Sequence, residues 1–319
     1  MRIVVTGALG HIGSRLVRDL PFSFPGSEIV MVDNLMTQRY CSLFNLPKEG
    51  SYRFIEADIT KMELQLFLEG VDVVVHLAAI TDAAGSFDRA EQVEQNNFNA
   101  TKRLAEACAK HSVRLIALSS TSVYGTQANM VDEDCSEDEL KPQSPYATTK
   151  LKEERLVQQL VTEHGLRAGI FRFGTIFGTS PGMRFHTAVN KFCWQAVMGQ
   201  PITVWTTAYD QKRPYLDLSD AVRAVEFVVK NDLFTGLVYN VVTENATVRQ
   251  VVDAIRNHIP SLKVKFIDSP IMNQLSYEVL NTRFAKAGFE VTGNLDQGIA
   301  DSVSLLRNAS KDSNNCFYP

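Results

Sequence analysis

Short apolar, β-branched runs alternate with helical stretches through the first half of the chain. Each run is followed by a polar or glycine-containing loop. This alternation is typical of βαβ units, and predicts an α/β fold with a Rossmann-type doubly wound parallel sheet. The runs lie at residues 3–6, 29–32, 54–56, 71–76, 115–119 and 166–173. Helices are expected at residues 90–111 and 146–164, the first with Val93, Phe98, Leu104 and Cys108 along one side.

The alternation loosens from Gly174 onward, where glycine and proline interrupt the pattern. Helices are predicted near 185–199 and 219–231, and short strands near 202–205 and 237–241. We therefore predict three segments along the chain. They are a dinucleotide-binding Rossmann domain at 1–173, a smaller α/β substrate domain at 174–307, partly interleaved with the first, and a disordered polar tail at 308–319.

The composition is that of an ordinary globular protein, with 319 residues, 45% of them hydrophobic, and a net charge of −4. It carries no basic excess that would favour nucleic acid, and no apolar run long enough for a membrane span. The N-terminus resembles a strand and a turn, not a signal peptide, so we expect a cytoplasmic protein. The five cysteines have no metal-ligand spacing, and we expect free thiols and no metal site.

Three glycines, Gly7, Gly10 and Gly13, follow the first predicted strand and open a helix. In a dinucleotide-binding turn the first allows a tight turn, the second lets backbone N–H groups approach the pyrophosphate, and the third permits close helix packing. Asp33 ends the second strand, twenty residues beyond Gly13, where a carboxylate accepts hydrogen bonds from the adenosine ribose. The spacing predicts an NAD site.

The charge of Asp33 would repel a 2′-phosphate, which favours NAD over NADP, although Arg39 lies close enough in sequence to weaken that preference. The alternative role of Asp33 is a turn cap. Asp58 is a candidate to accept a hydrogen bond from the adenine amine. Alternatively, it caps a helix beginning near Thr60. The predicted cofactor-binding residues are Gly7, Gly10, His11, Ile12, Gly13, Asp33, Asn34, Asp58, Ile59, Leu77, Ala78, Ala79, Tyr146 and Lys150.

Tyr146 and Lys150 stand four residues apart at the start of a predicted helix. Residues at this spacing share a helix face, so the ammonium can lie near the phenol and favour its ionised form. A free phenol, with a pKa of about 10, is a poor base near neutrality without such a cation. The pair therefore indicates a proton-transfer couple, and the alternative is an aromatic residue with a solvated neighbour.

An ordered series of motifs resembles the extended short-chain dehydrogenase/reductase family, in its NAD-dependent nucleotide-sugar epimerase/dehydratase branch. The resemblance covers about residues 1–300. It implies an NAD-binding Rossmann domain, a sugar-nucleotide domain, and a homodimer formed by two long helices from each subunit. It also implies that Tyr146 is the acid/base, that Lys150 lowers its pKa and holds the nicotinamide ribose, and that Ser120 hydrogen-bonds the substrate hydroxyl. The motifs are the glycine loop 6–13, segments 32–35, 76–79, 97–101, 119–125 and 145–150, Arg172 to Gly178, and Arg213 to Asp220.

Thr121 and Ser122 stand where 4,6-dehydratases of this family carry Asp-Glu and its decarboxylases carry Glu at the second position. A neutral hydroxyl is a poor base for a carbon-bound proton. The pair therefore favours a 4-epimerase, which needs oxidation assisted by Tyr146, rotation of the ketosugar and hydride return. The alternatives are a net oxidoreductase or a 4,6-dehydratase of the same family, and a non-catalytic NAD-sensing or RNA-associated scaffold.

The substrate side departs from the family pattern in two places. Thr175 stands where relatives have a substrate-contacting Asn, and residues 271–276 replace an Arg-containing segment that grips a diphosphate. Arg213 remains as the expected diphosphate partner, with Arg184 as a second cation, and His186 is expected either on the surface or at the rim of the pocket. The predicted substrate-binding residues are Thr81, Ser120, Thr121, Thr175, Arg184 and Arg213.

Overall fold

A seven-stranded parallel sheet forms the centre of the computed structural model, which describes residues 1–81, 86–125, 129–268 and 276–309. The strand order is β11-β7-β5-β4-β1-β2-β3. The order reverses between β1 and β4, which is where doubly wound sheets bind ligands at the carboxyl ends of their strands. The predicted fold class is confirmed. The strands are β1 (Arg2–Thr6), β2 (Glu28–Asp33), β3 (Ser51–Glu56), β4 (Val73–His76), β5 (Arg114–Ser120), β7 (Ala168–Phe173) and β11 (Val238–Val241).

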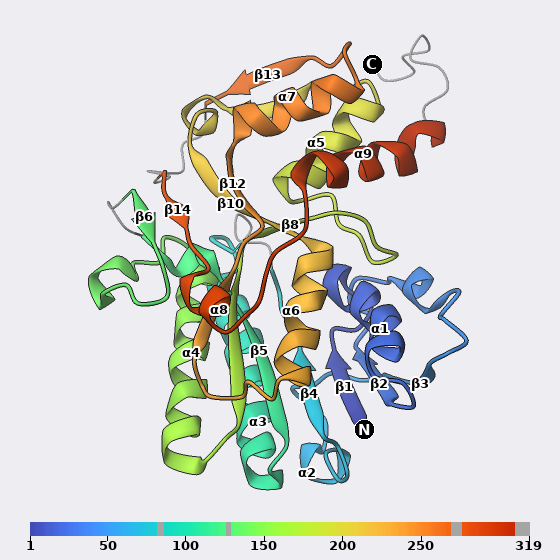
Figure 1. Ribbon diagram of the computed structural model, residues 1–319, viewed down its shortest axis with the longest axis vertical. Coiled ribbons are helices and arrows are strands. Elements are labelled where there is room, and N and C mark those ends of the chain that lie inside the picture. The colour runs from blue at the N-terminus through green and yellow to red at the C-terminus, as the bar shows by residue number, and fades with distance from the viewer. Residues whose placement is uncertain (82–85, 126–128, 269–275, 310–319) are drawn as a thin grey trace.

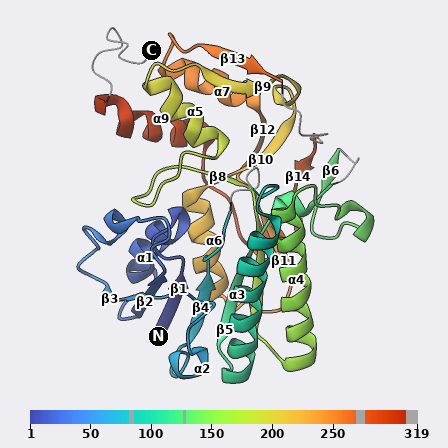
Figure 2. The same ribbon diagram turned by 180° about the vertical axis from the view of Figure 1, so that it is seen from behind.

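Helices cover both faces of this sheet, and Figures 1 and 2 show the two sides. Helices α1 (His11–Ser23) and α6 (Leu218–Lys230) pack on one face through buried aliphatic residues such as Leu16 and Val225. Helices α3 (Ala90–His111) and α4 (Pro145–His164) pack on the other, together with the short α2 (Leu64–Phe67). Leu104 and Cys108 of the predicted α3 face are fully buried there, so the helical period identified the side that meets the sheet.

Local sequence explains where α4 begins and ends. The Ser144 hydroxyl accepts a hydrogen bond from the Ala147 N–H, and Pro145 occupies the first turn, where its missing N–H costs nothing. Gly165 ends the helix with a φ of 66°, a left-handed conformation that glycine adopts without strain. Ser144 and Pro145 thus fix where α4 begins, and Tyr146 lies in its first turn.

The second region forms its own core above this edge (Figure 1). A three-stranded sheet and a strand pair combine with three helices around buried residues such as Phe177, Tyr215 and Ile299. Its elements are β8 (Thr175–Phe177), β9 (Ile202–Trp205), β10 (Lys212–Asp217), β12 (Glu244–Thr247), β13 (Val264–Ile267), α5 (Ala188–Val197), α7 (Val248–His258) and α9 (Leu295–Leu306).

The two regions exchange segments more than once. Strand β11 and helix α6 come after residue 174 in sequence, yet both belong to the Rossmann layers. A further small lobe pairs β6 (Met130–Val131) with β14 (Glu278–Val279), next to α8 (Thr282–Lys286). Residues 310–319 of the predicted tail lie outside the described residues. Short 3₁₀ helices lie at Tyr40–Leu43, Thr121–Val123, Glu137–Glu139, Thr206–Ala208 and Arg307–Ala309.

None of the described helices has the length and apolar character that crossing a membrane requires. The same part of the chain contains no group of three or more His, Cys, Asp or Glu side chains arranged to hold a metal ion.

Candidate active site

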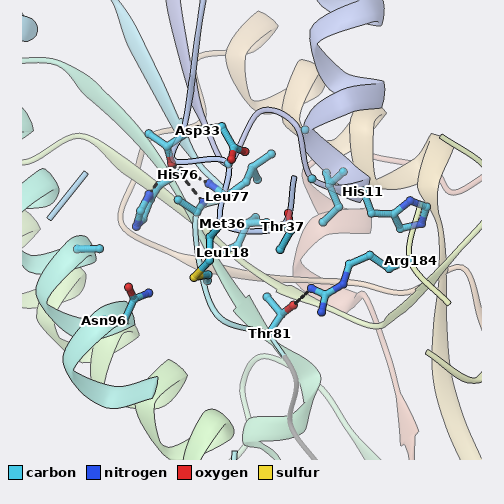
Figure 3. A pocket seen from close by; sticks show the side chains of 18 of the residues that line it. His11, Asp33, Met36, Thr37, His76, Leu77, Thr81, Asn96, Leu118 and Arg184 are labelled. Carbon is cyan, nitrogen blue, oxygen red and sulfur yellow. Dashed lines mark hydrogen bonds between the residues drawn. The ribbon is translucent and has the colours of Figure 1, made fainter. Parts of the chain in front are cut away.

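A cavity of about 470 Å³ lies at the carboxyl edge of the parallel sheet, beneath the second region. Figure 3 shows side chains from the glycine loop, the strand ends and the segment before α5 converging on it. Its volume and mixed lining are typical of a small-molecule site. The predicted site residues that line it are Gly7, Gly10, His11, Ile12, Gly13, Asp33, Asn34, Asp58, Ile59, Leu77, Ala78, Ala79, Thr81, Ser120, Tyr146, Lys150, Thr175 and Arg184.

The glycine loop forms a cradle that side chains would fill. Gly7 has a φ of 66°, and a Cβ added there would lie 2.7 Å from the Ala78 nitrogen. A Cβ at Gly13 would lie 2.4 Å from the Gly7 carbonyl oxygen. Helix α1 then begins with no side-chain cap and no acidic residue in its first turn, so its N–H groups keep their positive potential. The loop fits a pyrophosphate, as the spacing predicts.

Asp33 is held in place by backbone groups on two sides. Its Oδ2 accepts a hydrogen bond from the Leu9 N–H at 3.1 Å, and its Oδ1 accepts from the Leu35 N–H at 3.0 Å. A carboxylate has about four acceptor positions, so each oxygen can still accept from a ribose hydroxyl. Asp33 therefore makes turn-capping contacts, and its carboxylate still has free acceptor positions for a cofactor ribose.

Arg39 and Asp58 line the same cavity as Asp33. Burial and the cation of Arg184 lower the pKa of Arg39, while Asp33 opposes that shift, so these charges lie within range of one another. Asp58 accepts hydrogen bonds from the Thr60 N–H and hydroxyl, which lower its pKa. These contacts close a local turn, but the helix expected near Thr60 is not there, because α2 begins at Leu64 with Glu63 as its N-cap. The predicted helix-capping role of Asp58 is therefore wrong, and Asp58 does line the cavity.

Tyr146 and Lys150 share one face of α4, with the Lys150 Nζ 5.9 Å from the centre of the tyrosine ring. The balance of charges is nevertheless different from a simple cation–phenol pair. Burial raises the pKa of Tyr146, Lys150 lowers it, and Glu153 raises it again, so that the net direction is upward. Lys150 donates to Glu153 Oε2 at 2.9 Å, and both side chains are buried. The phenol therefore holds its proton firmly.

Ser120 and Ser122 form a hydroxyl pair in the lining of the cavity that Tyr146 also lines. The Ser122 N–H and Oγ both donate to Ser120 Oγ, at 3.2 and 2.9 Å. Ser122 also lines the cavity, whereas Thr121 is buried and donates its hydroxyl to the Phe173 carbonyl at 3.3 Å. Of the two hydroxyl residues singled out in the sequence, the second is the one that faces the site.

The substrate-side predictions separate in space. Arg184 donates a short hydrogen bond to Thr81 Oγ1, so both line the cavity together (Figure 3). Arg213 lies on β10, donates to Gln211 Oε1 at 3.0 Å, and is not among the described residues that line the cavity. Residues 271–275, where an arginine segment was expected, lie outside the described residues.

Two histidines in the cavity are kept neutral. Burial, together with the cations of Arg39 and Arg184, lowers the pKa of His11 to about 3. Its Nδ1 lies 2.8 Å from Ser180 Oγ. Burial and the Lys150 ammonium likewise lower the pKa of His76 to about 3. Neither ring is placed to carry a proton near neutrality.

Several lining residues were not predicted as site residues from the sequence. His76 is the last residue of the apolar run 71–76, and Met36 and Thr37 follow the run 29–32 within five residues, so the end of each predicted strand marks the place where they lie. His186 and Thr187 follow the predicted arginine. Asn96 belongs to the interior of α3, and no local signal marks it. The unpredicted lining residues include Met36, Thr37, Arg39, His76, Asn96, Leu118, Ser122, Ile176, His186 and Thr187.

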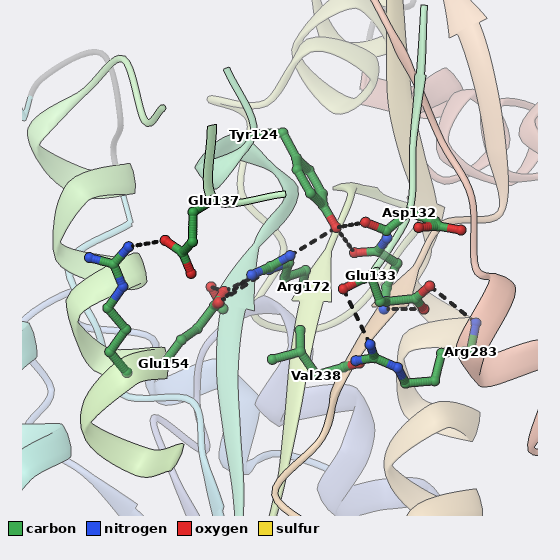
Figure 4. Close-up of polar contacts among 11 residues, drawn as sticks. Tyr124, Asp132, Glu133, Glu137, Glu154, Arg172, Val238 and Arg283 are labelled. Carbon is green, nitrogen blue, oxygen red and sulfur yellow. Dashed lines mark hydrogen bonds and ion pairs between the residues drawn. The ribbon is translucent and has the colours of Figure 1, made fainter. Parts of the chain in front are cut away.

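A buried polar network lies next to the carboxyl end of β5 (Figure 4). Glu154, the next residue after Glu153, accepts hydrogen bonds from Ser119 and from Arg172. Arg172 also donates to the Tyr124 hydroxyl at 3.0 Å. The network thus joins the end of β5 to α4 and β7.

The same network continues into the small lobe. The Tyr124 hydroxyl donates to Asn240 Oδ1 at 2.9 Å, and the Asn240 N–H donates to Glu133 Oε1 at 2.9 Å. Glu133 in turn accepts from the Arg283 N–H of α8. The β6–β14 lobe is therefore tied to the central sheet by buried hydrogen bonds (Figure 4).

A family model described as the NAD dependent epimerase/dehydratase family matches residues 3–241. An uncharacterized UDP-glucose epimerase of Bacillus subtilis, YtcB, is 33% identical over 267 residues, covering 81% of this chain and 82% of that protein. A trifunctional UDP-glucose 4,6-dehydratase/3,5-epimerase/reductase of Arabidopsis thaliana, RHM1, is 30% identical over 318 residues. That match covers 94% of this chain but 46% of the plant protein, so the chain spans about half of it.

Solved structures of other proteins match the fold of this protein over almost the whole chain. MoeE5 in complex with UDP-glucose and NAD has 29% identity and a TM-score of 0.82, covering 97% of this chain and 99% of that one. The UDP-glucuronic acid 4-epimerase of Bacillus cereus, in complex with UDP-glucuronic acid and NAD, has 26% identity and a TM-score of 0.83. That match covers 97% of this chain and 100% of the epimerase.

Proposed function

The chain belongs to the NAD dependent epimerase/dehydratase family, and from this membership we propose that it epimerises a nucleotide-linked hexose at C4 with NAD as its cofactor. The observation that carries the proposal is the chemistry of the groups that share the cavity with Tyr146. Ser120 and Ser122 line this cavity and present hydroxyls to it. The described lining residues include two carboxylates, Asp33 at the end of β2 and Asp58 after β3. These two strands lie at least three positions away in the sheet from β5, which carries Ser120.

This distribution of charge separates epimerisation from dehydration. Loss of water from the hexose requires a base at the carbon beside the transient ketone, and a serine hydroxyl is a poor one. Epimerisation requires proton transfer at one hydroxyl only, which a tyrosine can perform. The neutral Ser120–Ser122 pair thus favours the epimerase over the 4,6-dehydratase activity that the name of the plant relative includes.

The cradle, the uncapped helix and Asp33 are the groups that would hold NAD, through its pyrophosphate and its adenosine ribose. When bound, NAD supplies a hydride acceptor that becomes the donor in the return step. The remaining predicted cofactor contacts, among them Asn34, Ile59 and Ala79, line the same cavity.

The side chains at the sheet edge divide the proton chemistry between them. Tyr146 removes the proton of the substrate hydroxyl during oxidation and returns it when the ketosugar has rotated. Ser120 orients that hydroxyl by hydrogen bonding, and Lys150 supplies positive charge close to the phenol. Because burial keeps the pKa of Tyr146 above its usual value, the phenol stays protonated near neutrality and needs added positive charge to lose its proton and act as a base.

For the substrate we propose contacts from Thr81, Thr121, Thr175, Arg184 and Arg213. Thr81, Thr175 and Arg184 have support from their place in the cavity, where a guanidinium suits a diphosphate or a sugar oxygen. Thr121 and Arg213 do not line it, and their proposed contacts rest on the family resemblance. We also propose a homodimer built on α3 and α4, as the family resemblance implies.

The proposal is tested by NMR of the purified protein with NAD and a panel of UDP-, dTDP-, GDP- and CDP-hexoses. UDP-glucuronic acid belongs in this panel because a structural neighbour was solved with it. A C4 epimer formed without net change in absorbance at 340 nm supports the proposal. Loss of water points to the dehydratase, net NADH change to an oxidoreductase, and binding of NAD without turnover to a non-catalytic scaffold.

A further inference from the structure

We propose that Glu153 is a positioning residue that holds Lys150 and sets how much of its positive charge reaches the Tyr146 hydroxyl. The inference rests on the proposed function only in taking Tyr146 as the acid/base. Glu153 stands three residues after Lys150 on α4, and no motif in the sequence singled it out. Its side chain touches Lys150 directly, so it would act on the tyrosine through that lysine and through its own charge.

The geometry places an ion pair in the protein interior. Lys150 Nζ donates to Glu153 Oε2 at 2.9 Å, and Thr101 Oγ1 on α3 donates to the same oxygen at 3.0 Å. The two charged side chains are 6% and 5% exposed. At such burial neither water nor salt screens the carboxylate effectively, so its charge offsets that of the ammonium at close range.

Stability alone gives little reason for this carboxylate. Its second oxygen, Oε1, is buried and has no hydrogen-bond partner among the residues that the structure describes. A buried carboxylate with an unsatisfied oxygen costs free energy, and well-packed apolar residues often replace buried ion pairs without loss. The pair is therefore better explained by its effect on the neighbouring phenol.

The charges around the phenol act in opposing directions. Burial raises the pKa of Tyr146, Lys150 and Arg184 lower it, and Glu153 raises it. Burial by itself lowers the pKa of Lys150, but Glu153, Tyr146 and Glu154 together hold it above its usual value. His76 on β4 also faces Lys150, and it is neutral. Glu153 thus keeps the lysine charged while cancelling part of its pull on the phenol.

The test is a pH titration of tyrosinate ultraviolet absorbance on the purified protein, with neither NAD nor sugar added. Each protein is compared with its own Tyr146→Phe derivative, so the other tyrosines cancel. In Glu153→Gln we expect Tyr146 to ionise about one pH unit lower than in the wild type, roughly a tenfold larger ionised fraction at a given pH. Glu153→Asp, which keeps the charge, should retain most of the wild-type titration.

Two matched controls separate charge from packing. Thr101→Val removes a hydrogen bond to the same carboxylate oxygen but no charge. Glu154→Gln removes an equally buried carboxylate that pairs with Arg172 instead of Lys150. Both should lower thermal stability and leave the Tyr146 titration at its wild-type position. A Thr101→Val titration displaced as far as that of Glu153→Gln would overturn the proposal.

A double substitution decides the matter even where Glu153→Gln fails to fold. Lys150→Met with Glu153→Met leaves no unpaired buried charge, so it should fold. We expect Tyr146 to titrate near its wild-type position in the double variant and higher in Lys150→Met alone. A double variant that titrates as high as Lys150→Met, or a folded Glu153→Gln that titrates like the wild type, contradicts the role of Glu153. Since no sugar is present, either result is independent of the epimerase assay.

Discussion

Arg172 Nη2 donates to Glu154 Oε2 across 2.6 Å, and both side chains are almost fully buried, at 5% and 2% exposure. Arg172 also lies over the Tyr124 ring, 4.9 Å from its centre. The pair joins β7 to α4 one turn beyond Lys150. It therefore fixes the position of the helix that carries the proposed catalytic residues relative to the sheet that carries Ser120.

Removing one partner of this pair should be far more damaging than removing both. We expect Arg172→Met to lower the free energy of unfolding by about 3–5 kcal/mol, because Glu154 is left as an unpaired buried charge. The double variant Arg172→Met with Glu154→Met should recover a large part of that loss. Urea denaturation of the three proteins measures it. A double variant less stable than the single one would show that the hydrogen bonds to Tyr124 and Ser119 dominate.

Tyr146→Phe should lower kcat by about 10²- to 10⁴-fold, since the ring remains and only the proton-transfer group is lost. NAD binding, followed by calorimetry, should change little. Tyr209 provides a matched control, because it lies between Arg249 and Phe266 on the second region and does not line the cavity. The Tyr209→Phe variant should keep the wild-type kcat. Full activity in Tyr146→Phe would instead favour a scaffold role.

Asp33→Ser should weaken NAD binding by about 10- to 100-fold, the cost of charge-assisted hydrogen bonds to the ribose. It should also strengthen NADP binding, because the carboxylate no longer repels a 2′-phosphate and Arg39 remains close by. The measurement is the ratio of the NAD and NADP dissociation constants, determined for the variant and for the wild type. An unchanged ratio would limit Asp33 to holding the Leu9 and Leu35 N–H groups.

Gly7→Ala and Gly26→Ala form a matched pair for testing the cradle. Both glycines have left-handed φ values, 66° and 75°, so each alanine should cost about 1–2 kcal/mol of backbone strain. At Gly26 nothing lies within 4 Å of the added Cβ, whereas at Gly7 it meets Ala78. Gly7→Ala should therefore be the less stable variant and lose NAD affinity. Equal losses of stability in the two would argue against a tight cradle.

Stability should fall on acidification below pH 6.5 because His76 is buried and neutral. Its pKa is about 3 in the folded protein against about 6.5 when unfolded, so only the unfolded chain binds the proton between these values. The expected contribution is about 1.4 kcal/mol per pH unit, fully present above pH 6.5 and lost towards pH 3. The free energy of unfolding, measured by urea denaturation at several pH values from 7 to 5, should fall less steeply with decreasing pH in His76→Gln than in the wild type.

Local sequence determined much of the fold and of the cofactor side of the site. The apolar runs located six strands of the parallel sheet, and the helical period of residues 90–111 matched α3. The spacing of Gly7, Gly10 and Gly13 and that of Tyr146 and Lys150 placed these residues on the cavity. Such features are readable because glycine conformation and helix period act over a few residues.

Only the tertiary structure decided which distant residues meet. The apolar run near 237–241 was visible, but its place as the edge strand beside β7 depends on a long crossover. His11 meets Ser180 across 169 positions, and Thr101 reaches Glu153 from another helix. Arg213 carries a family motif but lies outside the cavity lining, and Ser122 rather than Thr121 faces it. These outcomes follow from how elements pack, and contacts between distant segments leave no signal in local periodicity.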